Sequence, residues 1–300
     1  MYHPVRLAAM LIYFFAALSA FTDGAPRSVY VNAKGKSSGN GSKQKPFISL
    51  EQAITHLITK EPPEKNQPFS STVIYVQSSM NVQDLLLLTI PVKIIGVNNA
   101  ELSFTENTGF FVYNTQLDIE NCRIIRKERK TEPRTVPLIY GSQSTIHLNN
   151  VVIESKEGGE TVILRNSNLV CKTTVFDTVQ DAQALLLRAE KSTIEAINST
   201  FICKGVFACI FSLREVECTL RDTYCTVLAE NSGMVADLVQ SRMKCQELHC
   251  VYTPSKQKTK ALSQRALAAL KTDAVSEVTF IPNCDFKGFS NAVYKDTAHE

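Results

Sequence analysis

One short phrase recurs six times between residues 117 and 251 and constrains the fold more than any other feature. In each copy an apolar, a polar, an apolar and a polar residue precede an Asn-like residue, and another apolar residue follows. The Asn-like residues lie at positions 121, 150, 173, 198, 222 and 247, so successive copies are 29, 23, 25, 24 and 25 residues apart. A nearly fixed period of this length is typical of a solenoid, whose repeats bury their apolar side chains against one another.

Each repeat contains two further apolar segments. One precedes the next copy of the phrase, over residues 136–140, 161–165, 184–188, 208–212 and 234–238. The other follows the Asn-like residue, and its apolar positions are Ile124, Ile153, Phe176, Phe201, Cys225 and Cys250. Three short strands in about 24 residues are typical of one coil of a parallel β-helix. A propeller repeat is longer, and the Leu-x-x-Leu-x-Leu ladder of a leucine-rich repeat is missing.

Stacking the copies predicts which side chains point inward and which point outward. Alternate residues of a strand face opposite sides. The inward row of the repeated phrase is predicted to be Ile119, Leu148, Cys171, Ala196, Leu220 and Cys245. One outward row is predicted to be Asp118, His147, Val170, Glu195, Thr219 and Lys244, and its neighbour begins with Glu120 and Asn149.

The segments on either side of the repeats are predicted to close the solenoid. Ser49-Leu50-Glu51-Gln52 is a capping box that begins an amphipathic helix, which Pro62-Pro63 ends. After residue 252 we predict a helix over residues 261–271, a strand over residues 278–281 and a surface tail. The prediction is one all-β solenoid domain over residues 26–300. It has an N-terminal cap over residues 26–70, coils over residues 71–252, and a partly helical C-terminal cap and tail over residues 253–300.

Residues 1–25 are predicted to be a cleaved export signal. Arg6 precedes an apolar run over residues 7–21, and Ser19-Ala20 or Gly24-Ala25 offers small residues for cleavage. A membrane anchor is the alternative, but the run is shorter than a spanning helix usually needs. We expect the mature protein in the periplasm, on the cell surface or outside the cell. The formal net charge of +3 gives no reason to expect a nucleic acid partner.

The entry into the solenoid resembles that of the pectate-lyase-like, right-handed parallel β-helix superfamily. The resemblance is carried by three features: the strand Val29-Tyr30-Val31-Asn32 followed by a Gly-rich turn and the Pro46-Phe47 step, the segment Pro91-Val92-Lys93-Ile94-Ile95-Gly96, and the Asn-marked repeats. It covers residues 28–252 and implies a single-stranded right-handed parallel β-helix. The superfamily includes lyases, hydrolases, adhesins and binding proteins, so the resemblance implies no single activity.

Catalysis would require carboxylates that converge on the outer face. The resemblance implies clustered acidic residues around Ca²⁺ for a lyase, or several carboxylates on adjacent coils for a hydrolase. Asp118 and Glu120 are close in the sequence but belong to one coil, and the next coil offers His147 and Asn149. A solvated face is the alternative interpretation. Asp118, Glu120 and His147 are therefore catalytic candidates that the sequence does not favour.

A basic segment follows the first Asn-like residue, where the period is longest. Its cationic residues are Arg123, Arg126, Lys127, Arg129, Lys130 and Arg134. The additional length predicts a projecting loop, and loops on rigid scaffolds often carry function. The segment is a candidate binding surface for an acidic polysaccharide, a phospholipid head group of the cell envelope or a nucleic acid. An exposed loop that only confers solubility is the alternative.

The nine cysteines show no paired spacing of the kind that binds a metal, so no metal site is predicted. Cys225 and Cys250 occupy the same position on neighbouring coils. Coil spacing would place their Cα atoms about 4.8 Å apart, within the range of a disulfide. They are a candidate bridge, with packing in the core as the alternative for them and for the other inward cysteines.

These observations favour an exported, non-catalytic protein that binds a carbohydrate or another cell-envelope component. The first alternative is a polysaccharide lyase or glycoside hydrolase acting on an acidic polysaccharide, and the second is a structural envelope protein. No cofactor is expected, apart from Ca²⁺ if the chain is a lyase. The sequence leaves the oligomeric state and the ligand open.

Overall fold

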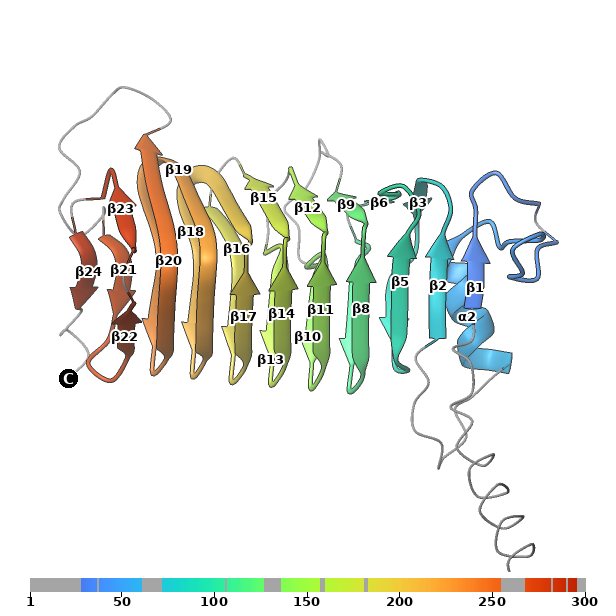
Figure 1. The fold of residues 1–300 in the computed structure, drawn as a ribbon, viewed down its shortest axis with the longest axis horizontal. Coiled ribbons are helices and arrows are strands. Elements are labelled where there is room, and N and C mark those ends of the chain that lie inside the picture. Colours follow the sequence, from blue (N-terminus) through green and yellow to red (C-terminus); the bar gives the residue numbers. More distant parts are fainter. Residues whose placement is uncertain are drawn as a thin grey trace, which may run out of the picture.

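The repeats stack into a rod of parallel strands (Figure 1). This computed structural model describes residues 28–295 apart from residues 37, 61–71, 106, 127–135, 157–159, 181–182, 255–267, 282 and 290. The predicted export signal therefore lies outside the described residues. Every strand pairing between coils is parallel, and each coil contributes a strand to three faces of the rod. The chain is thus a parallel β-solenoid, as the sequence period predicts.

Face 1 carries the repeated phrase and runs the whole length of the rod. Its strands are β1 (Ser28–Val31), β2 (Thr72–Val76), β5 (Val92–Gly96), β8 (Gln116–Glu120), β11 (Thr145–Asn149), β14 (Asn168–Lys172), β17 (Thr193–Ile197), the first parts of β19 (Glu217–Val239) and β20 (Arg242–Pro254), and β22 (Glu277–Phe280).

Face 2 follows the Asn-like residue of each repeat. Its strands are β3 (Met80–Val82), β6 (Glu101–Phe104), β9 (Arg123–Arg126), β12 (Val152–Ser155), β15 (Val175–Val179), the first part of β18 (Thr200–Arg214), later parts of β19 and β20, and β23 (Asp285–Lys287).

Face 3 leads back to face 1. Its strands are β4 (Leu86–Leu88), β7 (Phe110–Tyr113), β10 (Ile139–Ser142), β13 (Val162–Arg165), β16 (Gln183–Glu190), the last parts of β18 and β19, β21 (Ala268–Thr272) and β24 (Asn291–Lys295). The long strands β18, β19 and β20 each continue from one face to the next.

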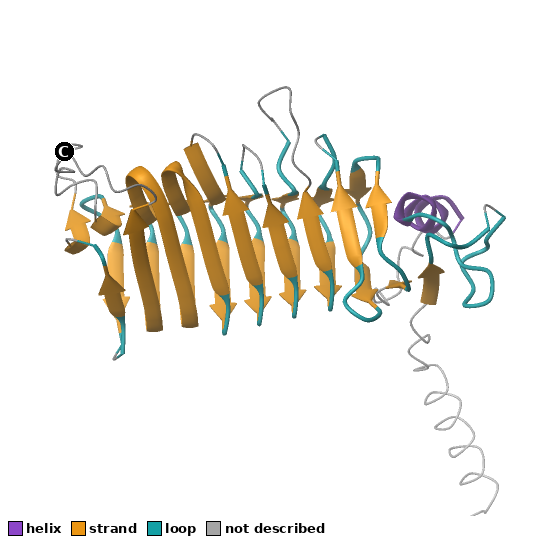
Figure 2. Cartoon of the chain, turned by 90° about the horizontal axis from the view of Figure 1, so that it is seen from above, coloured by secondary structure: helices purple, strands orange, loops and turns teal. Residues whose placement is uncertain are grey.

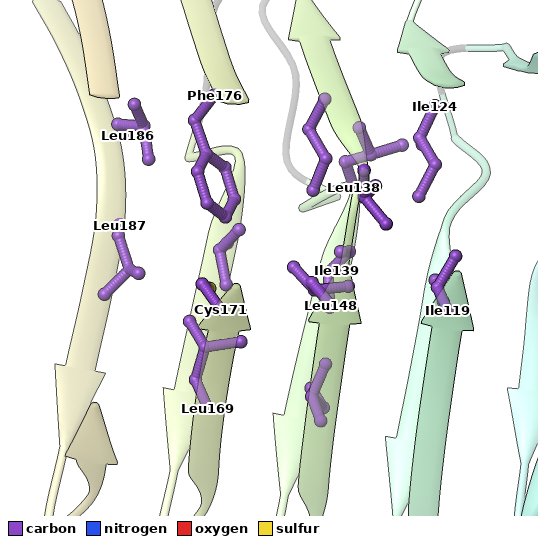
Figure 3. Close-up of a cluster of buried hydrophobic side chains, with 14 of the residues drawn as sticks. Ile119, Ile124, Leu138, Ile139, Leu148, Leu169, Cys171, Phe176, Leu186 and Leu187 are labelled. Atoms are coloured by element: carbon purple, nitrogen blue, oxygen red, sulfur yellow. The ribbon is translucent and has the colours of Figure 1, made fainter. Parts of the chain in front are cut away.

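The core lies between the three faces and consists of stacked like residues. Each predicted inward row is confirmed, because its members are register partners on successive coils. Figure 3 shows Ile119, Leu148 and Cys171 of face 1 among the buried side chains of this core. On face 2, the rings of Phe176 and Phe201 stack with centroids 4.9 Å apart.

The corner between faces 1 and 2 explains the Asn-like residue of the phrase. The residues at positions 121, 150, 173, 198, 222 and 247 all have positive φ, between 46° and 53°. Asn and Asp adopt this left-handed conformation more readily than other residues with a side chain. Asn150 also donates its Nδ2–H to Oδ1 of Asn121 at 2.8 Å, which forms one step of an Asn ladder.

A second left-handed corner joins face 3 to face 1, at positions 114, 143, 166, 191, 215 and 240. Next to it lies a row of buried serines. The hydroxyl of Ser167, for example, donates to the carbonyl of Arg165 and accepts the amide N–H of Ser144 from the adjacent coil. These bonds satisfy buried backbone groups where the strand ladders are interrupted.

At the N-terminal end of the rod lies the helix α2 (Leu50–Lys60), which begins at the capping box (Figure 2). The amide of Gln52 donates to the Ser49 hydroxyl at 3.2 Å, and the Gln52 side chain accepts the amide N–H of Ile48. Leu50, Ala53, Ile54 and Leu57 are buried and cover the end of the core, and the opposite side of the helix is exposed. Among the described residues no helix is long and apolar enough to cross a membrane.

The C-terminal end differs from the prediction. Residues 268–272 form β21 rather than a helix, and residues 261–267 lie outside the described residues. The strand predicted over residues 278–281 is present as β22, but β23 and β24 occupy the predicted tail. Parallel pairing therefore continues beyond residue 252. β21 pairs with β19, and β22 and β23 pair with β20, so these strands satisfy backbone groups at the exposed edges of β19 and β20. This pairing overrides the helical propensity of the Ala- and Leu-rich sequence.

The predicted disulfide is not formed in the structure. Cys225 and Cys250 are register partners, as expected, but both are free thiols. Side chains of directly opposed residues in parallel strands point the same way and are separated by about the strand spacing of 4.8 Å. A disulfide brings the Cβ atoms to about 3.8 Å, so it would require the two strands to move.

Candidate functional site

Asp118 is the centre of a hydrogen-bonded group on the outer side of face 1. Its Oδ1 lies 2.8 Å from Nδ1 of His147, its register partner on β11. Gln116 Nε2 lies 2.9 and 3.0 Å from the two carboxylate oxygens. The Asp118 side chain is 19% exposed, against 43% for His147. Carboxylate oxygens accept hydrogen bonds, so the Gln116 side-chain amide donates to Asp118.

Glu120 is paired with a different coil. Its Oε1 lies 2.7 Å from Nζ of Lys93 on β5, and both side chains are less than one third exposed. Asp118 and Glu120 therefore face outward from the same strand, but their side-chain partners lie on opposite neighbouring coils. The structure brings Asp118 and His147 together, and it does not bring Glu120 into the same group.

A groove lies beside Asp118, at the corner between faces 3 and 1. It has a volume of about 470 Å³. Its lining residues are Thr89, Pro91, Val92, Asn114, Thr115, Gln116, Asp118, Gln143 and Thr145. The left-handed residues Asn114 and Gln143 turn the chain here, so side-chain amides from two coils open into one cavity. Among these lining residues, Asp118 carries the one charge.

The two arginines of the basic segment that the structure describes have different environments. Arg123 is exposed, and its guanidinium binds Glu154 at 2.8 and 3.0 Å and Glu101 at 3.2 Å. Arg126 is only 1% exposed, so its assignment as a binding residue is wrong. Its guanidinium donates to the carbonyls of Thr108 and Val136 at 2.6 and 2.9 Å. Lys127, Arg129, Lys130 and Arg134 lie outside the described residues, and their binding role stays a prediction.

Two carboxylates that the sequence interpretation missed face outward on adjacent coils of face 2. Glu154 and Asp177 are register partners on β12 and β15. Burial, and next the nearby charge of Glu154, raise the pKa of Asp177, while Lys156 and Lys204 oppose the rise. Each carboxylate follows an inward residue, Ile153 or Phe176, by one position. Aligning the repeats on the apolar positions that follow the Asn-like residue would therefore have identified Glu154 and Asp177 as outward neighbours.

Among the described residues, no group of three or more His, Cys, Asp or Glu side chains could hold a metal ion. The oxygens of Asp118 already accept three side-chain contacts, and Glu120 is bound to Lys93. These two carboxylates therefore do not form the clustered, free oxygen ligands that Ca²⁺ prefers.

The strand pairing places the chain among the parallel β-solenoids. No known protein-family profile matches the sequence, and no curated protein matches it. Three similar solved structures were found. A rhamnogalacturonan lyase has a TM-score of 0.42 and 8% identity, over 90% of this chain and 87% of that one. Pectate lyase Pel9A has a TM-score of 0.37 and 10% identity, over 91% and 82%. A GH136 lacto-N-biosidase from Eubacterium ramulus has a TM-score of 0.36 and 9% identity, over 90% and 67%. At these identities the likeness concerns the fold alone.

Proposed function

We propose that this chain is an exported, non-catalytic solenoid that binds a carbohydrate in the groove beside Asp118. The observation that supports the proposal most is the lining of that groove. Sugar hydroxyls donate and accept hydrogen bonds at once, and they match amides, hydroxyls and a carboxylate held on a rigid scaffold. Asn114, Gln116, Gln143 and Asp118 supply these groups from two adjacent coils.

The pairing of the two candidate carboxylates supports binding rather than catalysis. A glycoside hydrolase needs one carboxyl group to donate a proton and another to act as base or nucleophile across the same bond. Asp118 is bound to His147 and Glu120 to Lys93, on opposite neighbouring coils. The groove therefore holds one charged acceptor, which orients a ligand, and lacks the opposed second carboxyl group that bond cleavage requires.

Calorimetry of the chain over residues 26–300 with a panel of oligosaccharides tests this proposal. Asp118→Ala and Gln143→Ala should each weaken binding at least tenfold, which corresponds to about 1.4 kcal/mol. Glu120→Ala should leave affinity nearly unchanged, because Glu120 does not line the groove. Lys244→Ala, an exposed change on face 1 several coils away, is the matched control. Unchanged affinity in the Asp118→Ala variant would refute the groove as the site.

The alternative function, a glycoside hydrolase, is favoured by one observation, the Glu154 and Asp177 pair. A raised pKa suits Asp177 to donate a proton, and Arg123 binds Glu154 as a carboxylate. Release of reducing ends from a polysaccharide, abolished by Asp177→Asn and by Glu154→Gln, would establish this alternative. If neither binding nor cleavage is seen on a broad panel of glycans, the structural envelope protein becomes the better proposal.

A further inference from the structure

The outer side of face 3 carries a row of apolar side chains next to the groove. Leu87, Phe111, Tyr140 and Ile163 are register partners on the successive strands β4, β7, β10 and β13. The rings of Phe111 and Tyr140 stack with centroids 5.2 Å apart and planes 24° apart. Tyr113, the next outward residue of β7, is 53% exposed, and Leu87 is 51% exposed. We call these five residues the apolar strip.

Four of the five strip residues lie on strands that lead into the groove, and Ile163 lies on the next coil. Further along the same outward row, the register partners are Arg188, Ser212 and Asp237, which are charged or polar. A change from apolar to polar within one row shows that the strip is not a general property of face 3. Exposed apolar side chains gathered in one place on a soluble surface mark binding sites more often than isolated ones do.

The strip and the groove are continuous along each strand. Leu87 precedes the groove residue Thr89 by two positions, and Tyr113 directly precedes Asn114. On the next coil Tyr140 precedes Gln143 by three positions. At about 3.3 Å per residue, the two surfaces are within roughly 10 Å of one another. One ligand can therefore lie on the strip and reach the amides of the groove.

We propose that the apolar strip and the groove form one extended site for a neutral polysaccharide, whose chain lies along the rod axis. This inference rests on the carbohydrate binding proposed above and names the class of ligand. The C–H surfaces of a sugar ring pack on aromatic and aliphatic side chains, and its hydroxyl edge suits the amides. Because the strip follows the stacking direction of the coils, successive sugars would meet successive coils.

The charges of the groove lining favour a neutral ligand over a polyuronate. No residue of the strip is charged, and the groove lining contains Asp118 but no Lys or Arg. Lys93, the nearby cation on face 1, is bound to Glu120 at 2.7 Å. A uronic acid in the groove would bring its carboxylate towards Asp118, and Lys93, the register partner of Asp118, is already paired with Glu120. A neutral sugar instead gives Asp118 hydroxyl groups that donate hydrogen bonds to it.

The size of the strip argues against a second copy of this chain as the occupant. A stable protein interface buries about 800 Å² on each partner, from some 20–30 residues. The strip consists of five side chains in a row one to two residues wide. A narrow, elongated apolar surface of this kind matches an extended chain molecule better than a broad protein face.

The test compares neutral with acidic oligosaccharides on the full chain. Hexamers of maltose, cellulose and chitin type are the neutral probes, and oligogalacturonate and hyaluronate are the acidic probes. We expect a neutral probe to bind, with affinity that rises with chain length and is insensitive to salt. Tyr113→Ala and Tyr140→Ala should each weaken binding at least tenfold. Phe207→Ala is the matched control, because Phe207 is 50% exposed on face 3 but lies outside the strip.

The outcomes separate this inference from the proposed function. If Asp118→Ala weakens binding but the two Tyr variants do not, the groove binds carbohydrate and the strip does not take part. Preference for the acidic probes, with affinity that falls as salt rises, would overturn the assignment of a neutral ligand. If no probe binds, and sedimentation shows a dimer that Tyr113→Ala dissociates, the strip is an interface between copies and both proposals fail. Thermal unfolding of each variant excludes loss of the fold.

Discussion

At the scale of single residues, the left-handed corners place the strongest demand on the sequence. Five of the six residues at the first corner are Asn, Asp or Glu, and the sixth is Thr173, with φ of 50°. A β-branched residue is strained in this conformation. Thr173 also stands between Asn150 and Asn198, so it interrupts the ladder that Asn121 and Asn150 begin.

Thr173→Asn is therefore expected to stabilise the chain. The change relieves the left-handed strain and restores an amide that can bond to Asn150, and we expect the free energy of unfolding to rise by about 0.5–1.5 kcal/mol. Equilibrium denaturation in urea measures the change. Thr173→Ala removes the branch but supplies no amide, and it should gain clearly less. If Thr173→Asn is no more stable than the wild type, the backbone at position 173 is not strained.

Asp177 provides a prediction with a defined dependence on pH. Its pKa in the folded chain is raised above the ordinary value of 3.8, so protonated Asp177 favours the fold. That contribution is complete below the ordinary pKa and is lost as pH rises through the raised pKa. Asp177→Asn should thus stabilise the chain at pH 7 by no more than about 1 kcal/mol, because the side chain is partly solvated.

The gain from Asp177→Asn should shrink as the pH falls towards 3, where wild-type Asp177 is itself protonated. Unfolding in urea at a series of pH values measures it. Glu195→Gln is the control, since the register partners of Glu195 are Val170 and Thr219 and carry no charge. A gain that is independent of pH would mean that repulsion and burial do not act on the Asp177 carboxylate.

At the scale of the element, β9 shows how one strand separates two kinds of arginine. Arg123 points outward to Glu101 and Glu154, and Arg126 is buried against the carbonyls of Thr108 and Val136. These two carbonyls precede the face 3 strands β7 and β10. Arg126 therefore connects face 2 to face 3 at the point where the regular period of the chain is interrupted.

Arg126→Met is expected to lower the free energy of unfolding by roughly 3 kcal/mol, because two buried carbonyls lose their donor. Arg123→Ala, on the same strand, should cost less than about 1 kcal/mol, since its ion pairs are exposed. Arg126→Lys should recover only part of the loss, because one ammonium does not reproduce the planar fork of a guanidinium. Equal losses at the two positions would contradict the structural role assigned to Arg126.

The elements also show which parts of the fold the sequence can predict. The inward rows were predictable because the period and the alternation of strands follow from backbone geometry. The second left-handed corner was not recognised, since Asn114, Gln143, Lys191 and Glu215 share no residue type. Arg126 was misassigned because a charged residue in a basic segment indicates exposure, and the spacing does not show that its guanidinium meets the carbonyls of Thr108 and Val136. The groove was missed because its lining combines residues of the corner between faces 3 and 1 from successive coils.

At the scale of the whole molecule, stability is distributed along one dimension. Each coil contacts its two neighbours, so local opening should begin at the ends and proceed inward.

The cysteines lie at different positions along the rod, so their reactivity can report where the rod opens. All nine are free, and seven are buried, while Cys209 and Cys284 are partly exposed. Burial raises the pKa of the Cys122, Cys203 and Cys218 thiols to about 12, so their reactive thiolate is scarce in the folded chain.

Thiol labelling under native conditions should therefore follow position along the rod. Cys284, on the last coil, should react first, then Cys250 and Cys245, and Cys171 near the middle should react last. Mass spectrometry of peptides after timed labelling measures the order, and labelling in denaturant should modify all nine. Simultaneous reaction of the buried thiols would indicate that the rod opens as one unit. Protection of Cys225 and Cys250 that persists in denaturant until a reductant is added would instead show that the two are bridged in solution.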